Sequence, residues 1–173
     1  MYLLDTNVVS ELRKAMHGRA DPRVVAWQAQ VDPSHCFIAT TTVMELEIGI
    51  LRMERRDAMQ GAILRQWLEQ HVLPAFSQRI LSFDLATARQ CARLHVPDPR
   101  SERDAMIAAT ALVHGLTVVT RNAADFEATG VPLLNPWGKW TLQEQSADYL
   151  QQRILTPLGM SARMDQMKIK NSL

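Results

Sequence analysis

The feature that most constrains the fold is a regular alternation of short apolar runs with longer segments of helical periodicity. The apolar runs lie at residues 2–4, 36–39, 79–83, 116–119 and 132–137. Each is too short for a core helix and is bounded by polar or turn-forming residues, which is typical of a buried parallel strand. Strands that alternate with helices form βαβ units with parallel strands and right-handed connections. We therefore expect an α/β fold with a central parallel sheet of about five short strands.

Capping residues and helix breakers place the helices between these runs. The helices are expected at residues 8–14, from Pro22 onward, and at 40–53, 57–71, 85–92 and 101–115. The last is the clearest, because Ser101 and Asp104 match a Ser-x-x-Asp capping box and Gly115 is a typical stop. In the 57–71 segment, Met59, Ile63 and Trp67 follow helical spacing, which indicates a core or a dimer surface.

Length and composition predict one main domain. The chain has 173 residues, of which 47% are hydrophobic, enough for one core and too few for two. We expect the main domain at residues 1–140. The composition changes beyond Trp140, so residues 141–173 are interpreted as a C-terminal extension that is partly helical or flexible.

Charge and cysteine content exclude several classes of protein. Lys and Arg number 19 against 18 Asp and Glu, for a net charge of +1, so no global basic field favours nucleic acid. The two cysteines, Cys36 and Cys91, stand in apolar stretches, which predicts reduced, buried thiols in an intracellular protein. No segment has the roughly 18 continuous apolar residues of a membrane span. We therefore expect a cytoplasmic protein with no membrane partner.

Acidic residues follow the ends of the predicted strands. They are Asp5, Glu45, Asp104 and Asp125. In a parallel sheet the carboxyl ends of the strands share one edge, where ligands bind, so these acids are expected to converge. Each also has a simpler interpretation: Asp5 could cap the first helix, and Asp104 could complement a helix dipole.

Converging carboxylates require a positive charge among them, because each close pair costs roughly several kcal/mol at an effective dielectric constant near 20. No His or Cys accompanies the four acids. Oxygen-only ligands select hard ions such as Mg²⁺ or Mn²⁺ over Zn²⁺.

The motifs around these acids resemble those of one known family, the PIN-domain ribonucleases, and within it the VapC-like and FitB-like toxins of toxin–antitoxin pairs. The matching motifs are Leu-Asp-Thr-Asn-Val-Val-Ser-Glu at 4–11, Met-Glu-Leu at 44–46 with Gly49, Arg-Asp-Ala-Met-Ile-Ala-Ala-Thr-Ala at 103–111, Thr-Arg-Asn-Ala-Ala-Asp-Phe at 120–126 and Asn-Pro-Trp at 135–137. The resemblance covers residues 1–137. One departure is a loop before Asp104 that looks shorter than usual and carries Pro97 and Pro99.

The resemblance implies a three-layer α/β/α fold and Mg²⁺- or Mn²⁺-dependent endonucleolytic cleavage of RNA. The residues that it implies as catalytic and metal-binding are Asp5, Glu45, Asp104 and Asp125, and those that it implies as supporting hydrogen-bond partners are Thr6, Asn7, Thr120 and Asn122. It also implies a cognate antitoxin across the acidic groove, contact with DNA only through that antitoxin, and a homodimer.

Local cations are the candidates for steering RNA phosphates. They are Arg13, Lys14, Arg52, Arg100, Arg103 and Arg121, although each is also compatible with an ordinary solvated surface residue.

Three alternatives remain open at this point. A haloacid-dehalogenase-like phosphatase also begins with a strand that ends in Asp, but it needs a second Asp where this chain has Asn7. A phosphate-accepting signalling module needs a Lys at the final strand, and the first Lys beyond that strand is Lys139. A non-catalytic PIN-fold protein that acts through an antitoxin–DNA complex would keep the fold and lose the chemistry.

Overall fold

The centre of the protein is a five-stranded sheet in which every strand runs parallel to its neighbours. The computed structural model describes residues 1–138. The strands are β1 (Tyr2–Leu4), β2 (Cys36–Ala39), β3 (Ile80–Leu81), β4 (Thr117–Val119) and β5 (Leu133–Leu134). Their order is β3-β2-β1-β4-β5, which confirms the expected parallel sheet of short strands. Leu3 of β1 lies opposite Phe37 on one side and Val118 on the other.

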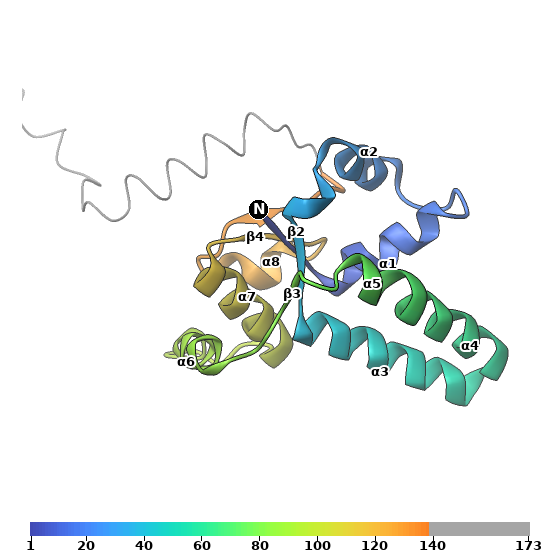
Figure 1. The fold of residues 1–173 in the computed structure, drawn as a ribbon. Coiled ribbons are helices and arrows are strands. Elements are labelled where there is room, and N and C mark those ends of the chain that lie inside the picture. The colour runs from blue at the N-terminus through green and yellow to red at the C-terminus, as the bar shows by residue number, and fades with distance from the viewer. Residues whose placement is uncertain (139–173) are drawn as a thin grey trace, which may run out of the picture. The chain divides into compact units, whose positions relative to one another are not determined.

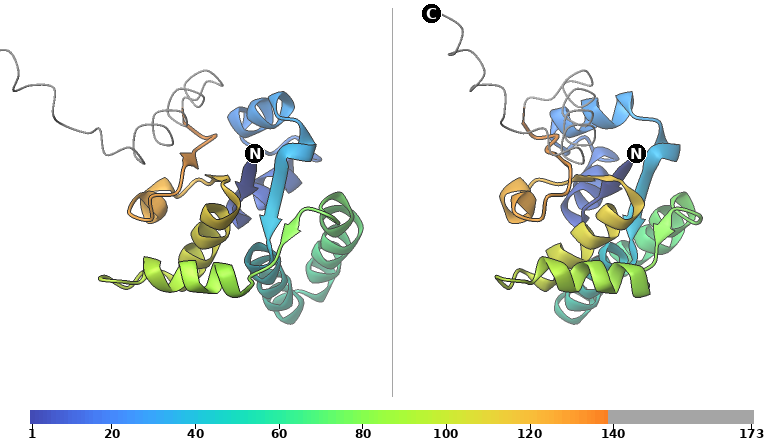
Figure 2. Two further views of the ribbon diagram at one scale, coloured as in Figure 1. Left: turned by 60° about the vertical axis from the view of Figure 1, so that its left-hand side comes forward. Right: turned by 90° about the vertical axis from the view of Figure 1, so that its left-hand side faces the viewer.

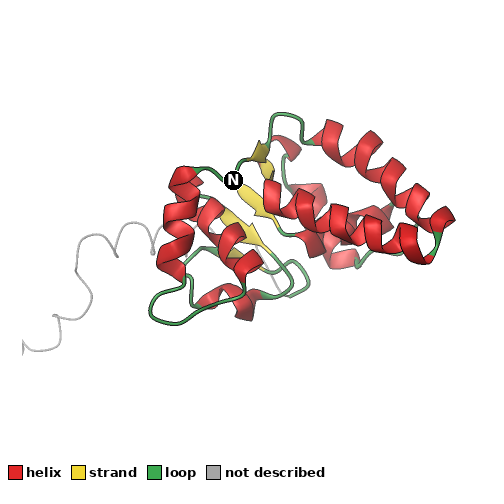
Figure 3. Ribbon diagram, turned by 90° about the horizontal axis from the view of Figure 1, so that it is seen from below, coloured by secondary structure: helices red, strands yellow, loops and turns green. Residues whose placement is uncertain are grey.

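Helices connect consecutive strands (Figure 1). They are α1 (Thr6–Ala15), α2 (Pro22–Gln30), the 3₁₀ turn η1 (Pro33–His35), α3 (Thr40–Arg56), α4 (Ala58–Trp67), the π-helical turn η2 (Leu68–Val72), α5 (Leu73–Ala75), α6 (Leu85–Leu94), α7 (Glu102–His114) and α8 (Ala123–Glu127). The strands run between two groups of helices (Figure 3), so the fold is the expected α/β/α arrangement of three layers.

The core forms where α7 and α8 pack on the strands. Its buried members are Leu3, Ala39, Ile107, Ala108, Ala111, Leu116, Val118, Phe126 and Val131. Alanines on α7 allow close packing against the sheet, as expected from the sequence. Each fully buried Leu, Ile or Phe side chain contributes about 1.5–3 kcal/mol of hydrophobic free energy, which fixes β1 and the start of α7 relative to each other.

A second group of contacts joins α3 and α4, which lie side by side as a hairpin (Figure 1). A Cβ at Gly61 would lie 2.5 Å from the Cα of Glu54, so only glycine permits this close approach. Arg65 of α4 forms ion pairs with Glu47 and Glu54 of α3. The hairpin is therefore tied by backbone packing and charge.

The apolar spacing at residues 57–71 was interpreted as a core or dimer surface. In the structure, some of these apolar side chains are buried and others are exposed. The side chains of Met59 and Ile63 are 80% and 55% exposed, whereas Leu68 is 1% exposed. The first two therefore lie outside the core. The expected single helix is also interrupted. After Trp67 the backbone forms the π-helical turn η2, and the short helix α5 that follows contains Pro74, which has no N–H to donate.

Other differences concern element ends. The first helix begins at Thr6 rather than Val8, because Asp5 is its N-cap residue and accepts a hydrogen bond from the Thr6 N–H. Ser101 occupies the N-cap position of α7 but makes no capping hydrogen bond, so the capping-box prediction is wrong. Its partner in that motif, Asp104, lines a cleft instead. The last strand is confined to Leu133–Leu134, since the turn at 135–138 follows at once.

Two further expectations concern the whole chain. Cys36 and Cys91 are both free and buried, as predicted. Within residues 1–138 no helix is long and apolar enough to cross a membrane. The C-terminal extension expected at residues 141–173 lies outside the described residues, so that expectation and the boundary near residue 140 stay predictions.

Candidate active site

The candidate site begins where β1 ends, at Asp5. Its side chain is 6% exposed. The backbone N–H of Thr6 donates to Asp5 Oδ1 at 2.6 Å, which makes Asp5 the cap of α1. The capping interpretation is therefore confirmed, and the second carboxylate oxygen is left to face other partners.

That second oxygen, Oδ2, is held by a polar network. The Thr120 hydroxyl, at the end of β4, donates to it at 2.7 Å, and the Asn7 amide nitrogen donates to it as well. Thr120 Oγ1 in turn accepts the Asn122 N–H at 3.0 Å, while the Asn7 amide oxygen accepts the Arg121 N–H at 3.2 Å. These bonds join the ends of β1 and β4 and fix the orientation of Asp5.

Two other predicted acids reach the same cleft from separate helices. Glu45 lies in α3, which follows directly from β2 (Figure 2), and Asp104 lies in the first turn of α7. Both side chains are partly buried. They line a cleft of about 340 Å³ together with Asp5, Thr6, Asn7 and Asn122, and Ser10, Ile48, Gly49, Arg52 and Arg103 complete its wall. The structure thus brings three of the four predicted acids together.

The fourth predicted acid, Asp125, is placed differently. It lies in the first turn of α8 with an exposed side chain, and it does not line the cleft described above. Its backbone N–H bonds to the carbonyl of Asn122, so α8 starts beside the site even though the Asp125 carboxylate faces solvent. The role of Asp125 stays a prediction.

Burial and charge both act on Asp5. The pKa of Asp5 is raised to about 6, mainly by loss of solvation and to a smaller extent by the neighbouring carboxylates of Glu45 and Asp104. Hydrogen bonds from the Thr120 hydroxyl and the Thr6 N–H lower it and offset part of that cost. A buried carboxylate in the field of two others has a strong preference for a nearby cation.

The donor set fits a hard divalent cation, because the three acidic side chains that line the cleft offer only oxygen atoms as ligands. Among residues 1–138, however, no three His, Cys, Asp or Glu side chains are arranged so that they could hold an ion without moving. Glu45 explains part of this result. One of its oxygens accepts the Thr6 hydroxyl, and the other lies 3.6 Å from Arg103 Nη1.

Four of the six candidate cations have other structural partners. The Arg100 guanidinium donates to the carbonyls of Leu94 and Ala128, and the Lys14 ammonium pairs with Glu11. The other two of these four stack on aromatic rings: Arg13 on Trp67 and Arg121 on Trp137. Only Arg52 and Arg103 line the cleft.

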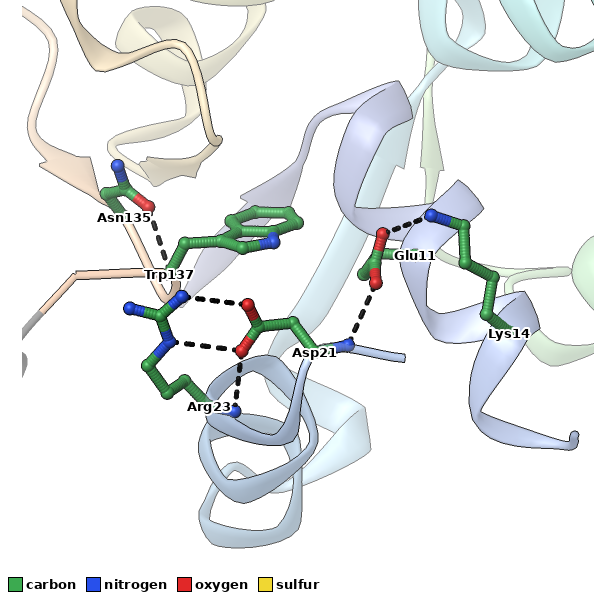
Figure 4. Close-up of polar contacts among 6 residues, drawn as sticks. All are labelled: Glu11, Lys14, Asp21, Arg23, Asn135 and Trp137. Atoms are coloured by element: carbon green, nitrogen blue, oxygen red, sulfur yellow. Dashed lines mark hydrogen bonds and ion pairs between the residues drawn. The ribbon is translucent and has the colours of Figure 1, made fainter. Parts of the chain in front are cut away.

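Sequence reasoning missed a second buried carboxylate, that of Glu11, which is 8% exposed. Its oxygens accept the Lys14 ammonium at 2.7 Å and the Asp21 N–H at 2.9 Å (Figure 4). Asp21 in turn accepts both the backbone N–H and the guanidinium of Arg23. The cluster fixes the connection between α1 and α2. A Glu at the buried spacing of α1 was the only signal in the sequence.

The fold and the cleft define a class of protein, and the comparison with known families agrees. Residues 2–131 match the model of the PIN domain, so the chain belongs to the PIN domain family.

Its relatives carry the names of toxins and ribonucleases. The chain is similar to the VapC ribonuclease Y4jK of Sinorhizobium fredii, with 39% identity over 79% of this chain and 98% of that protein. It is also similar to Toxin FitB of Neisseria gonorrhoeae, with 37% identity over 79% of this chain and 99% of that protein. The crystal structure of FitAcB from Neisseria gonorrhoeae superposes with a TM-score of 0.72 at 35% identity, over 80% of this chain and 100% of that one.

Proposed function

We propose that this protein is a divalent-metal-dependent endoribonuclease and the toxin of a toxin–antitoxin pair. The observation that carries the proposal is the meeting of Asp5, Glu45 and Asp104, from three separate elements, in one cleft. The relatives named VapC ribonuclease and Toxin FitB support the reaction and the biological class.

In this proposal Asp5 and Asp104 are the principal ligands of Mg²⁺ or Mn²⁺. Glu45 completes the site directly or through water, and Asp125 acts through water from α8. When bound, the ion lowers the pKa of a coordinated water and neutralises charge on the phosphoryl oxygens. The carboxylates would orient a water for in-line attack on phosphorus; the water loses a proton to solvent, and the leaving oxygen of the RNA chain takes up a proton as its bond to phosphorus breaks.

The hydrogen-bonding residues keep the principal ligand in position. Thr120 and Asn7 both donate to Asp5 Oδ2, so they set the direction of the remaining lone pairs. Thr6 bonds Glu45, and Asn122 bonds Thr120. Partners of this kind orient ligands, and their loss typically costs about tenfold to a hundredfold in metal affinity or activity.

The proposed partners follow from the class. RNA is the substrate, a cognate antitoxin is the inhibitor, and DNA is reached only through the antitoxin. An Arg of the antitoxin could pair with the carboxylates of the cleft in a bidentate manner. We also propose a homodimer, for which the exposed Met59 and Ile63 are a candidate surface. The buried free thiols support an intracellular, cytoplasmic place of action.

The test is cleavage of total RNA by the purified protein in Mg²⁺, beside the variants Asp5→Asn, Asp104→Asn and Asp98→Asn. Asp98 is a matched control, because it is an exposed acid in the loop before α7. We expect the parent and Asp98→Asn to cut RNA, EDTA to stop both, and the two cleft variants to be inactive. Cleavage that resists EDTA and persists in both cleft variants contradicts the proposal.

A further inference from the structure

Arg103 occupies an unusual position for a cation. It lies in the first turn of α7, where Glu102 and Asp104 complement the positive end of the helix dipole. A positive side chain at this end of a helix is unfavourable. The Arg103 side chain is 46% exposed, so burial of its methylene groups does not fully offset this unfavourable interaction with the helix dipole. The compensation comes from the cleft, where its guanidinium faces Glu45.

The contact with Glu45 is loose. Arg103 Nη1 and Glu45 Oε1 are 3.6 Å apart, beyond the usual 2.7–2.9 Å or so of a charge-assisted hydrogen bond. The other oxygen of Glu45 accepts the Thr6 hydroxyl. Glu45 therefore has a firm neutral partner on one side and a loosely held, half-exposed cation on the other.

A metal ion and Arg103 cannot both occupy the same side of Glu45. The Thr6 hydroxyl can remain bonded while an ion binds, since it carries no charge. The guanidinium must leave, because two cations on one oxygen repel each other. A long, half-exposed side chain can rotate away at little cost, and its planar guanidinium recognises phosphate groups such as those of RNA well.

We propose that Arg103 neutralises Glu45 in the metal-free site and, when a divalent cation binds, moves to a phosphate of the RNA beside the scissile bond. The inference rests on the proposed function and adds a substrate-binding residue to it. It also accounts for the arrangement found here, in which the acids line one cleft although no three of them within residues 1–138 form a ready metal site.

Arg52 provides the matched control. It lines the same cleft from α3, and within residues 1–138 it forms no ion pair with Glu45 or another acid. Removing Arg52 deletes one positive charge from the cleft without releasing Glu45. The pair of variants therefore separates direct exchange at Glu45 from a general change in electrostatic field.

The experiment measures Mg²⁺ binding by titration calorimetry without RNA, using the full chain, Arg103→Ala, Arg103→Lys and Arg52→Ala. We expect Arg103→Ala to bind Mg²⁺ about threefold to fivefold more tightly than the parent, since a partly exposed ion pair of this kind is lost. Arg103→Lys should lie between the two, and Arg52→Ala should match the parent. Circular dichroism and urea unfolding check that each variant is folded.

The same variants are then compared in RNA cleavage. Arg103→Ala should lower kcat/KM by about tenfold or more, because a charge-assisted contact to phosphate is lost. Tighter metal binding together with weaker cleavage is an outcome that a purely structural role of Arg103 does not give.

Three results overturn the inference. They are unchanged or weaker Mg²⁺ binding by Arg103→Ala, equal tightening in Arg52→Ala, and undiminished cleavage by Arg103→Ala. If the parent cuts RNA in Mg²⁺ while one of these is found, only this inference fails. If the parent neither binds Mg²⁺ nor cuts RNA, the proposed function itself fails.

Discussion

Helix α1 has one buried carboxylate at its N-cap, Asp5, and another within its length, Glu11, and the surroundings of the two are opposite. Asp5 is 6% exposed and Glu11 is 8% exposed. Burial, and to a smaller extent the carboxylates of Glu45 and Asp104, raise the pKa of Asp5, whereas the Lys14 ammonium and the Asp21 N–H lower the pKa of Glu11. Burial alone therefore does not mark a functional acid. What distinguishes Asp5 is burial next to charges of the same sign. This arrangement favours binding of a cation and destabilises the metal-free protein.

The largest expected difference between the two acids is in catalysis. Asp5→Asn should reduce RNA cleavage by about a hundredfold or more, because it removes a principal metal ligand. Glu11→Gln should retain the cleavage rate of the parent within about threefold, as its contacts lie outside the cleft. Initial rates on a defined RNA in Mg²⁺ at 25 °C measure both. Equal losses of cleavage rate in the two variants would contradict the proposed difference between a functional and a structural carboxylate.

The next effect is the pH dependence of stability without metal. The pKa of Asp5 rises from 3.8 to about 6 in the folded protein, so the folded state binds a proton more tightly than the unfolded state. The contribution of Asp5 to the free energy of unfolding should be largest below about pH 4 and should fall by roughly 2–3 kcal/mol as the pH rises to about 6. Urea unfolding in EDTA across this range measures the fall.

Asp5→Asn is the control for that experiment and should lack this part of the pH dependence. Glu11 has the opposite sign: its lowered pKa contributes stability that is present at neutral pH and is lost on acidification through its folded pKa. A parent protein and an Asp5→Asn variant with the same pH dependence of stability would contradict the assignment for Asp5.

A smaller effect is expected from the hydroxyl that supports Asp5. Thr120→Val keeps the shape of the side chain and removes the donor to Asp5 Oδ2, so it should lower kcat/KM by about tenfold. Thr110→Val is matched to it, since Thr110 is also fully buried but donates to the Met106 carbonyl of its own helix. Steady-state kinetics should show the loss in the first variant alone.

The smallest expected effect is on the stability provided by Glu11. Glu11→Gln weakens the bonds to the Lys14 ammonium and the Asp21 N–H, which should lower the free energy of unfolding by about 1 kcal/mol at neutral pH. Urea denaturation measures the change. A stability equal to that of the parent would mean that the α1–α2 connection does not depend on this charge.

The sequence predicted those parts of the fold that depend on local pattern. The second strand was expected at 36–39 and is found at Cys36–Ala39, because a continuous apolar run buried in a sheet leaves little ambiguity. The helix expected at 85–92 is found at Leu85–Leu94, where Asp84 is the N-cap and accepts the Thr87 N–H. Element ends that depend on tertiary context were less predictable, as the uncapped Ser101 and the π-helical turn at Leu68–Val72 demonstrate.

The candidate site was predictable to a similar degree. Asp5, Glu45 and Asp104 were placed at one edge by their position after strands, and they line one cleft. The orientation of Asp125 could not be deduced, since it depends on how α8 turns away from β4. The role of Glu11 was also hidden, because the N–H that it accepts belongs to Asp21, on another segment of the chain. The partners of the basic side chains could not be deduced either, because they depend on the three-dimensional structure.

The strand order has a consequence for biosynthesis. β1 lies between β2 and β4, so the first strand made by the ribosome receives one of its neighbours only after residue 117 has been synthesised. The Thr120 hydroxyl that holds Asp5 arrives later still than Asp104. A growing polypeptide therefore has no assembled cleft through most of its translation.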